Sequence, residues 1–429
     1  MKVIRYTDAD YAEAIRALDR RAVPADATRE SVEAILRDVR ARGDAALVEL
    51  TLRFDGADLA AGGLAVTDDE LDAARRAAPD DLRAAVAATL ANVRLFARHS
   101  LRQNWKTTNH QGAEVGEVFH PLGRVGIYVP GGTAPLVSTA LMTVPFAVEA
   151  GVPEIVVTTP CGRDGQVNEA LLYALSEAGA TEIHKVGGAQ AIGALAYGTA
   201  TIRPVDKIYG PGNSYVVEAK RQVFGVAGVD LLPGPSEILV LADATARADW
   251  IAADLLAQAE HGKDSQIVVI TDHEPLLQDV IAAIATQAAT LTRQGPLRGV
   301  LDHCAYAVLE RSMDEAVRLV NAFAPEHLSL VVADPDALLP GIRTAGAIYV
   351  GACSAVAVGD FLAGPSHELP TAGAGKAFPG LTADMFQRRT SVVRLDPASI
   401  RASLPAVRAF ARVEGLDAHG RSVECRTEP

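Results

Sequence analysis

The chain has little of several features that mark particular classes of protein. Its 429 residues include four cysteines and 5% aromatic residues, and the formal net charge is −13. An acidic chain is poorly suited to hold the phosphates of a nucleic acid, so we expect no nucleic-acid partner. None of the cysteines shares a Cys-x-x-Cys spacing, which argues against a disulfide framework and a thiolate zinc site. They are Cys161, Cys304, Cys353 and Cys425.

Long apolar runs are also missing. The first residues, MKVIRYTD, contain no apolar signal core, and no run approaches the roughly 18 to 20 apolar residues that span a bilayer. We therefore expect a cytoplasmic protein with no membrane partner. Since 49% of the residues are hydrophobic, the chain can bury a large core and divide into two or more domains.

Nucleotide fingerprints are absent as well. Glycine-rich loops occur at 130–135, 187–193 and 210–213, but none spells the Gly-x-Gly-x-x-Gly pattern that grips a dinucleotide, and no Gly-Lys-Ser/Thr phosphate loop is present. The loops are placed where parallel sheets bind ligands, after short apolar runs. Glycines that merely turn the chain explain them equally well, so spacing alone permits a nucleotide without requiring one.

What the chain does have is an alternating pattern of short β-branched runs and helical stretches. Residues up to about 105 have the spacing of successive helices. From residue 125 onward the alternation predicts parallel sheets covered by helices, in two series on either side of the Pro-Gly-Pro connector at 233–236. The first series of predicted strands is 125–129, 154–157, 183–186 and 207–209. The second is 238–241, 266–270, 305–309, 328–332 and 347–350.

The predicted fold is therefore α/β, with two Rossmann-like, incompletely doubly wound parallel-sheet domains. A helical N-terminal region and a small C-terminal helical tail complete it. We expect the N-terminal region at 1–120, partly packed on the second α/β unit, the first α/β domain at 121–236 and the second at 237–380. The tail follows at 381–429.

One short segment suggests metal chemistry. Gln258 and His261 close an apolar helix, and residues three apart on a helix project from one face, so an amide oxygen and an imidazole nitrogen can meet at one point. Further donors must come from elsewhere. Histidines occur together with carboxylates at 325–327, 360–367 and 414–419. A site that gathers these residues would be a metal-assisted catalytic centre.

Eight motifs in order, from about residue 120 to 425, resemble the histidinol dehydrogenase family. They are GRVGIYVPGG (123–132), VGGAQAI (186–192), DKIYGPGN (206–213), GPSE (234–237), AQAEHG (257–262), APEHL (324–328), GD with PSH (359–367), and EGLDAH (414–419).

The resemblance implies a zinc- and NAD-dependent enzyme that oxidises L-histidinol through L-histidinaldehyde to L-histidine, the last step of histidine biosynthesis. It makes Glu326 and His327 the catalytic pair. The implied zinc ligands are Gln258, His261, Asp360 and His419. The implied NAD contacts are Tyr128, Gln190 and Asn213. The substrate site would be lined by Ser236, His327 and Glu414 together with the zinc ligands.

These assignments agree with the chemistry of the residue types. A histidine titrates near neutral pH, which suits His327 to remove a hydroxyl proton as hydride leaves the carbon. Glu326 beside it can take a proton from the water that adds to the aldehyde. Because Glu414 and His419 lie far along the chain, we expect them to reach the partner subunit of a homodimer with shared sites. Ser366 and Glu368 stand where many relatives have Asn and a small or apolar residue.

Other interpretations remain open at this point. A zinc and NAD dehydrogenase of the same fold could act on another polyol or amino alcohol, and a metal-dependent hydrolase would need no nucleotide. A non-catalytic binding protein would not need both Glu326 and His327. Cys161 could serve as a nucleophile for an aldehyde, although nothing nearby in sequence would activate it.

Overall fold

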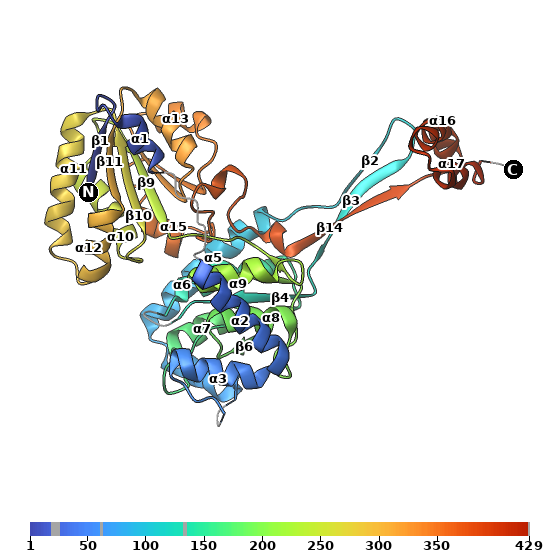
Figure 1. Cartoon of the computed structure of the whole chain (residues 1–429), viewed down its shortest axis with the longest axis horizontal. Coiled ribbons are helices and arrows are strands. Elements are labelled where there is room, and N and C mark those ends of the chain that lie inside the picture. Colours follow the sequence, from blue (N-terminus) through green and yellow to red (C-terminus); the bar gives the residue numbers. More distant parts are fainter. Residues whose placement is uncertain (19–25, 61–62, 132–134, 428–429) are drawn as a thin grey trace.

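Two rounded α/β units and a thin arm make up the molecule. The computed structural model describes residues 1–18, 26–60, 63–131 and 135–427. In Figure 1 the two units lie one above the other, and the arm leads away from both to the last helices. Among the described residues, no helix has both the length and the apolar character needed to cross a bilayer.

The first unit is built on a five-stranded parallel sheet with the order β6-β5-β4-β7-β8. All four strands predicted for this unit are confirmed, and β8 is added as a two-residue edge strand. The strands are β4 (Arg124–Tyr128), β5 (Glu154–Thr158), β6 (Glu182–His184), β7 (Lys207–Tyr209) and β8 (Gly228–Val229). The connecting helices are α6 (Val137–Glu149), α7 (Glu169–Ala178), α8 (Gly188–Tyr197) and α9 (Ser214–Val223).

Four helices from the N-terminal region pack into the core of this first unit. On α5, Val86, Leu90, Val93 and Ala97 recur at spacings of three and four residues, which gives the helix one buried face. These side chains share one core cluster with the strands of the first sheet. The four helices are α2 (Asp26–Arg42), α3 (Asp44–Asp55), α4 (Asp68–Ala77) and α5 (Asp80–His99).

The second unit is built on a six-stranded parallel sheet with the order β1-β11-β10-β9-β12-β13. All five strands predicted for this unit are confirmed. The strands are β1 (Lys2–Arg5), β9 (Glu237–Ala242), β10 (Gln266–Thr271), β11 (Ala305–Leu309), β12 (His327–Val331) and β13 (Ala347–Val350). The helices are α1 (Tyr11–Arg16), α10 (Ala248–Ala259), α11 (Glu274–Ala288), α12 (Gln294–His303), α13 (Met313–Phe323), α14 (Pro335–Leu338) and α15 (Val356–Phe361).

The central strand β9 is buried on both faces. Ile238, Val240 and Ala242 belong to the core cluster on one face of the sheet, and Leu239 and Leu241 belong to the cluster on the other. Alternate residues of a strand point to opposite faces, so a sheet covered by helices on both sides needs continuous apolar strands.

Strand β1 corrects the expectation that the chain begins with helices only. Lys2 to Arg5 pair in parallel with β11, with Val3 opposite Ala307. Four residues are too few to show a strand period against the helical pattern that follows. The first strand and α1 thus join the second sheet, whereas α2 to α5 pack in the first unit. The division of the chain into four domains stays a prediction.

The arm is an antiparallel three-stranded sheet that the sequence did not predict. Its order is β14-β3-β2, and β14 pairs with β3 along its whole length. The strands are β2 (Trp105–Thr108), β3 (Glu114–Pro121) and β14 (Gln387–Arg394), and short 3₁₀ turns occur at Leu339–Gly341, Ala374–Lys376 and Ala383–Phe386. The expected C-terminal helices, α16 (Pro397–Glu414) and α17 (Asp417–Glu424), lie at the far end of the arm (Figure 1).

With these elements, the expected fold class is confirmed: two parallel α/β units, a helical N-terminal region and a C-terminal helical tail.

Candidate active site

Glu326 and His327 lie at the amino end of β12, beside the first residue of β9. The His327 ring places Nδ1 3.0 Å from the carbonyl oxygen of Glu237. A carbonyl oxygen only accepts, so Nδ1 carries the proton in this bond and Nε2 is left as the basic nitrogen of the neutral ring. The Glu326 Oε2 accepts the main-chain N–H of Glu237 at 2.8 Å. Neighbouring strands therefore hold both side chains in place.

This position differs from the usual one in parallel sheets. Such sheets bind ligands at the carboxyl ends of their strands. The candidate pair instead lies where β12 begins, at the amino edge of the second sheet. The segment 366–371 joins this edge to the first unit, because Ser366 donates its hydroxyl hydrogen to the carbonyl of Met142 in α6 (2.7 Å).

Asp360 faces the candidate pair, Glu326 and His327, from α15. Its Oδ1 lies 3.4 Å from His327 Nε2. Burial alone would raise the pKa of Asp360, but the rings of His327, His367 and His261 outweigh it and lower that pKa. Burial would likewise lower the pKa of His327, yet the carboxylates of Glu326 and Asp360 hold it well above the ordinary value.

Gln258 and His261 approach the same place from the end of α10. Gln258 is in the last turn and is 2% exposed, and His261 follows the helix in a tight turn, with its Nδ1 3.3 Å from the Gln258 carbonyl. His261 is exposed. Helix α10 packs against α15, which carries Asp360, and the charge of His261 contributes to the lowered pKa of Asp360. One chain therefore brings Gln258, His261 and Asp360 to the side of the candidate pair.

Three buried polar atoms at this place form no hydrogen bond among the described residues: Gln258 Nε2, His327 Nε2 and Asp360 Oδ1, the last two of which face each other only as the 3.4 Å ion pair. Buried polar atoms are normally paired, so such a group marks a site for a ligand or an ion. In the described part of the chain, no three His, Cys, Asp or Glu side chains come together as a metal site. A metal site here would therefore need an additional donor, such as the amide oxygen of Gln258.

His367 links the first unit to this site. Its Nδ1 lies 3.0 Å from the main-chain oxygen of Asp360, and its Nε2 lies 3.4 Å from the Thr139 hydroxyl of α6 and 3.6 Å from Glu368 Oε1. Burial lowers the pKa of His367. The ring thus contacts the backbone at Asp360 and helps fix where that residue lies.

The expected NAD contacts come from the carboxyl edge of the first sheet. Tyr128 ends β4, Gln190 lies in the first turn of α8, and Asn213 precedes α9. The Tyr128 hydroxyl accepts the N–H of Gly188 at 3.2 Å, and burial raises the pKa of Tyr128 to about 12. The Asn213 side chain caps α9 by accepting the N–H groups of Tyr215 (3.0 Å) and Val216 (3.2 Å).

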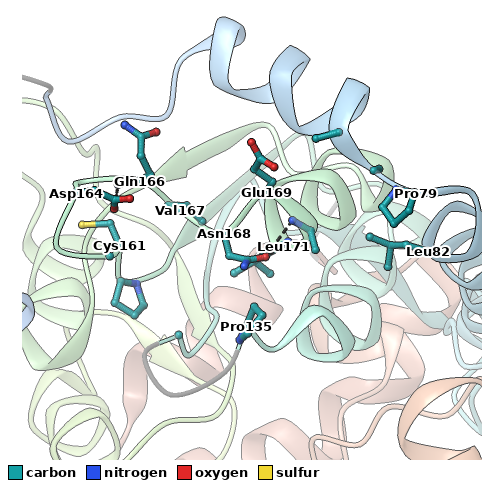
Figure 2. A pocket seen from close by; sticks show the side chains of 16 residues that line it. Pro79, Leu82, Pro135, Cys161, Asp164, Gln166, Val167, Asn168, Glu169 and Leu171 are labelled. Atoms are coloured by element: carbon teal, nitrogen blue, oxygen red, sulfur yellow. Dashed lines mark hydrogen bonds between the residues drawn. The ribbon is translucent and has the colours of Figure 1, made fainter.

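A cavity of about 700 Å³ opens beside the carboxyl ends of β4 and β5. Figure 2 shows Cys161, Asp164 and Gln166 from the loop after β5 on one side of it, with Pro79 and Leu82 across from them. Part of the glycine-rich loop at 130–135 lies outside the described residues. Burial raises the pKa of the Cys161 thiol, which is the opposite of what a cysteine nucleophile needs.

The remaining expected site residues are spread out. Ser236 lies in the connector before β9 and is half-buried. Glu414 ends α16 and His419 belongs to α17, and both are exposed. Within a single chain, these two helices are remote from α10 and α15 (Figure 1). The chain alone therefore brings together the expected catalytic pair and three of the four expected metal ligands, but not His419 or Glu414.

Two residues at the site had no role in the sequence interpretation. Tyr349 of β13 places its ring centroid 6.0 Å from that of His327. A Cβ atom at Gly359 would meet this ring at 2.3 Å, so glycine lets the backbone before Asp360 pass close to the tyrosine. Glu237 forms hydrogen bonds with both Glu326 and His327. Its place in the motif at 234–237 was the only signal for it.

Comparisons with known proteins agree with this arrangement. The family model described as histidinol dehydrogenase matches residues 18–427. The histidinol dehydrogenase of Geobacillus kaustophilus is 45% identical over 400 residues, which cover 93% of this chain and 94% of the relative. That of Rhizobium meliloti is 46% identical over 395 residues, covering 92% and 91%. That of a Synechococcus strain is 42% identical and spans 100% of this chain and 99% of its own.

Solved structures give the same result. The crystal structure of histidinol dehydrogenase from Elizabethkingia anophelis superimposes with a TM-score of 0.95 at 32% identity, covering 99% of this chain and 98% of that one. An acetylating aldehyde dehydrogenase from Geobacillus thermoglucosidasius shares the fold alone, with a TM-score of 0.50 and 14% identity. With a family match across nearly the whole chain and relatives above 40% identity, the chain belongs to the histidinol dehydrogenase family of oxidoreductases.

Proposed function

We propose that this chain catalyses the NAD-linked, four-electron oxidation of L-histidinol through L-histidinaldehyde to L-histidine, with zinc at the site formed by Gln258, His261 and Asp360. The observation that carries the proposal is the 3.4 Å approach of His327 Nε2 to Asp360 Oδ1. It puts a candidate base directly beside a candidate metal ligand. The relatives named above are histidinol dehydrogenases, which supports the substrate.

The donor set fits zinc. Zinc takes imidazole nitrogen and carboxylate oxygen in sites that leave a position for substrate. Gln258, His261 and Asp360 would supply an amide oxygen, an imidazole and a carboxylate, and His419 of a second subunit would complete the set. The unpaired, buried Oδ1 of Asp360 supports this assignment, because a carboxylate oxygen is a zinc donor. When bound, zinc would anchor the amino alcohol through its nitrogen atoms. With its negative charge shared with zinc, Asp360 would stabilise the charged His327 ring less and so favour the neutral ring that a base needs.

The first oxidation needs a base at the substrate hydroxyl. His327 is held by its Nδ1–H bond to the Glu237 carbonyl, so Nε2 is the atom that takes the hydroxyl proton. NAD, when bound against Tyr128, Gln190 and Asn213, would accept the hydride. These residues lie at the carboxyl edge of the first sheet, and the contacts of 366–367 with α6 connect that unit to the catalytic pair.

The second oxidation needs water at the aldehyde. Glu326 is buried, at 5% exposure, and adjoins His327, with its Oε2 3.4 Å from His327 Nδ1. Its carboxylate would take a proton from the water that adds to the aldehyde carbon, and the hydrate would then pass its hydride to a second molecule of NAD to give the carboxylate product. One pair of side chains serves both halves of the reaction. Ser236 would contact the substrate, and the Glu414 carboxylate would pair with its cationic amino group.

The active form would be a homodimer with shared sites. The arm and the last two helices expose large apolar side chains, which is typical of a surface that another chain covers. These are Val392, Val393, Leu395, Phe410, Val413 and Leu416. An arm that carries Glu414 and His419 away from its own body can deliver them to the site of a second copy.

Counting the NADH formed for each histidinol consumed tests the proposal. We expect two NADH per histidinol, and we expect turnover to stop after zinc is removed by a chelator and to return when zinc is restored. One NADH per substrate would contradict the four-electron reaction. Turnover of other amino alcohols or polyols in preference to histidinol would favour a different substrate on the same fold.

A further inference from the structure

Glu237 is the buried residue that touches both members of the catalytic pair. It begins β9 and is 1% exposed. Its main-chain N–H donates to Glu326 Oε2 at 2.8 Å, and its carbonyl accepts from His327 Nδ1 at 3.0 Å. These two bonds come from the backbone and would exist with other side chains at this position, provided that the backbone stayed in place.

The Glu237 side chain makes a second set of bonds. Its Oε1 accepts the main-chain N–H of Glu326 at 3.3 Å and that of Ala372 at 3.1 Å. Ladder pairing between β9 and β12 starts at His327, opposite Ile238. The N–H of Glu326 lies just before that ladder, so the carboxylate oxygen extends the hydrogen bonding between the two strands by one residue.

The same oxygen holds a strained residue. Ala372 has a φ of 53°, in the left-handed region that a residue with a Cβ rarely adopts. Such a conformation persists only where the surroundings enforce it. The preceding Thr371 accepts the N–H of Gly234 on its hydroxyl, so this loop is also tied to the connector before β9. Glu237 thus joins the connector, the loop at 371–372 and the start of β12.

We propose that Glu237 is a positioning residue for the oxidation: one oxygen of its side chain fixes the backbone at Glu326, and thereby the placement of the Glu326 carboxylate and the His327 ring. The inference rests on the catalytic roles proposed above for those two residues. Reacting groups that are displaced by about 1 Å can lose on the order of 100-fold in rate, so a single backbone bond at this point matters.

Three substitutions at position 237 separate the effect of side-chain length from the effect of its negative charge. An amide oxygen has two lone pairs, so Glu237→Gln can still accept both N–H groups. Glu237→Asp keeps the charge, but its side chain is one methylene shorter and cannot hold both. Glu237→Leu removes the acceptor. The measurements are kcat and KM for histidinol, bound zinc, and the thermal unfolding temperature of each variant.

We expect Glu237→Gln to stay within a few-fold of the wild-type kcat. We expect kcat to fall on the order of 100-fold in Glu237→Asp and Glu237→Leu, with KM and bound zinc unchanged. Glu310→Leu is the matched control. It removes another buried carboxylate of the same sheet. Glu310 follows β11 at the carboxyl ends of the strands, away from the candidate site, and forms a hydrogen bond with Tyr11. It should keep the wild-type kcat.

Two results would overturn the inference: a wild-type kcat in Glu237→Asp with a large loss in Glu237→Gln, or wild-type rates in all three variants. The Gln and Asp variants decide the matter even if the Leu variant does not fold. Failure of the wild-type enzyme to oxidise histidinol would contradict the proposed function itself, whereas normal wild-type turnover with unaffected variants would contradict only the role of Glu237.

Discussion

His327 Nε2 and Asp360 Oδ1 lie 3.4 Å apart, although one residue begins a strand of the second sheet and the other belongs to a short helix after that sheet. This approach puts the proposed base beside a proposed metal ligand. Together with the larger effect of Glu326, it holds the pKa of His327 high, and the His327 ring in turn lowers the pKa of Asp360.

Replacing His327 by Asn tests the base. The Asn amide can still donate to the Glu237 carbonyl, but no nitrogen remains to take a proton. We expect kcat for histidinol to fall by about 10²- to 10⁴-fold, which is the usual contribution of a general base. Bound zinc, measured by elemental analysis, should stay at the wild-type level. A variant that keeps its kcat would remove His327 from the mechanism.

Replacing Asn213 by Asp tests the NAD contact apart from stability. Asp caps a helix as well as Asn does, so the two bonds to the start of α9 survive and the unfolding temperature should change little. The added negative charge would face the phosphates of NAD and raise the KM for NAD several-fold, while the KM for histidinol stays unchanged. Steady-state kinetics with each substrate varied in turn measure both. An unchanged KM for NAD would place the cofactor elsewhere.

The ion pair of Glu182 with Arg124 predicts how acid affects stability. The Arg124 guanidinium donates to Glu182 at 2.6 and 2.8 Å and lowers the pKa of that carboxyl from 4.5 to about 2. A lowered folded-state pKa stabilises the fold above the unfolded value of 4.5, and the contribution is lost as the pH falls toward 2.

Glu182→Gln should therefore lower the free energy of unfolding at pH 7 by about 1 to 2 kcal/mol, a range reduced because the side chain is one-third exposed to solvent. The difference from the wild type should shrink between pH 4.5 and about 2. Denaturant unfolding at several pH values measures it, with the exposed Glu177→Gln as control. A difference that grows on acidification would contradict the assignment.

Much of the fold follows from local patterns. The buried parallel strands, such as β9 and β10, are continuous apolar runs between turn residues, so all nine predicted strands were found. The missed strands lack that pattern. Strand β8 has two residues, and β2 is exposed along its whole length. Strand β14 is mostly exposed and forms only because it pairs with β3, a contact that sequence periodicity cannot show.

The geometry of the candidate site was harder to predict from local sequence patterns. Gln258 and His261 are close in sequence, but their meeting with Asp360 depends on how α10 packs against α15. The family resemblance pointed to Glu326 and His327 as the catalytic pair, but not to their location at the amino edge of the sheet. The role of Glu237 depends on the register between β9 and β12, and that register cannot be inferred from the sequence of either strand alone. His419 lies beyond what one chain can bring to the site.

Complementation between two inactive chains tests the central claim most directly. A Gln258→Ala chain and a His419→Ala chain should each be inactive alone. In a verified heterodimer, one site would carry both changes and the other neither, so activity should return to about half of the wild-type value per dimer. Heterodimers without activity would mean that each site is built from a single chain and would contradict the shared zinc site.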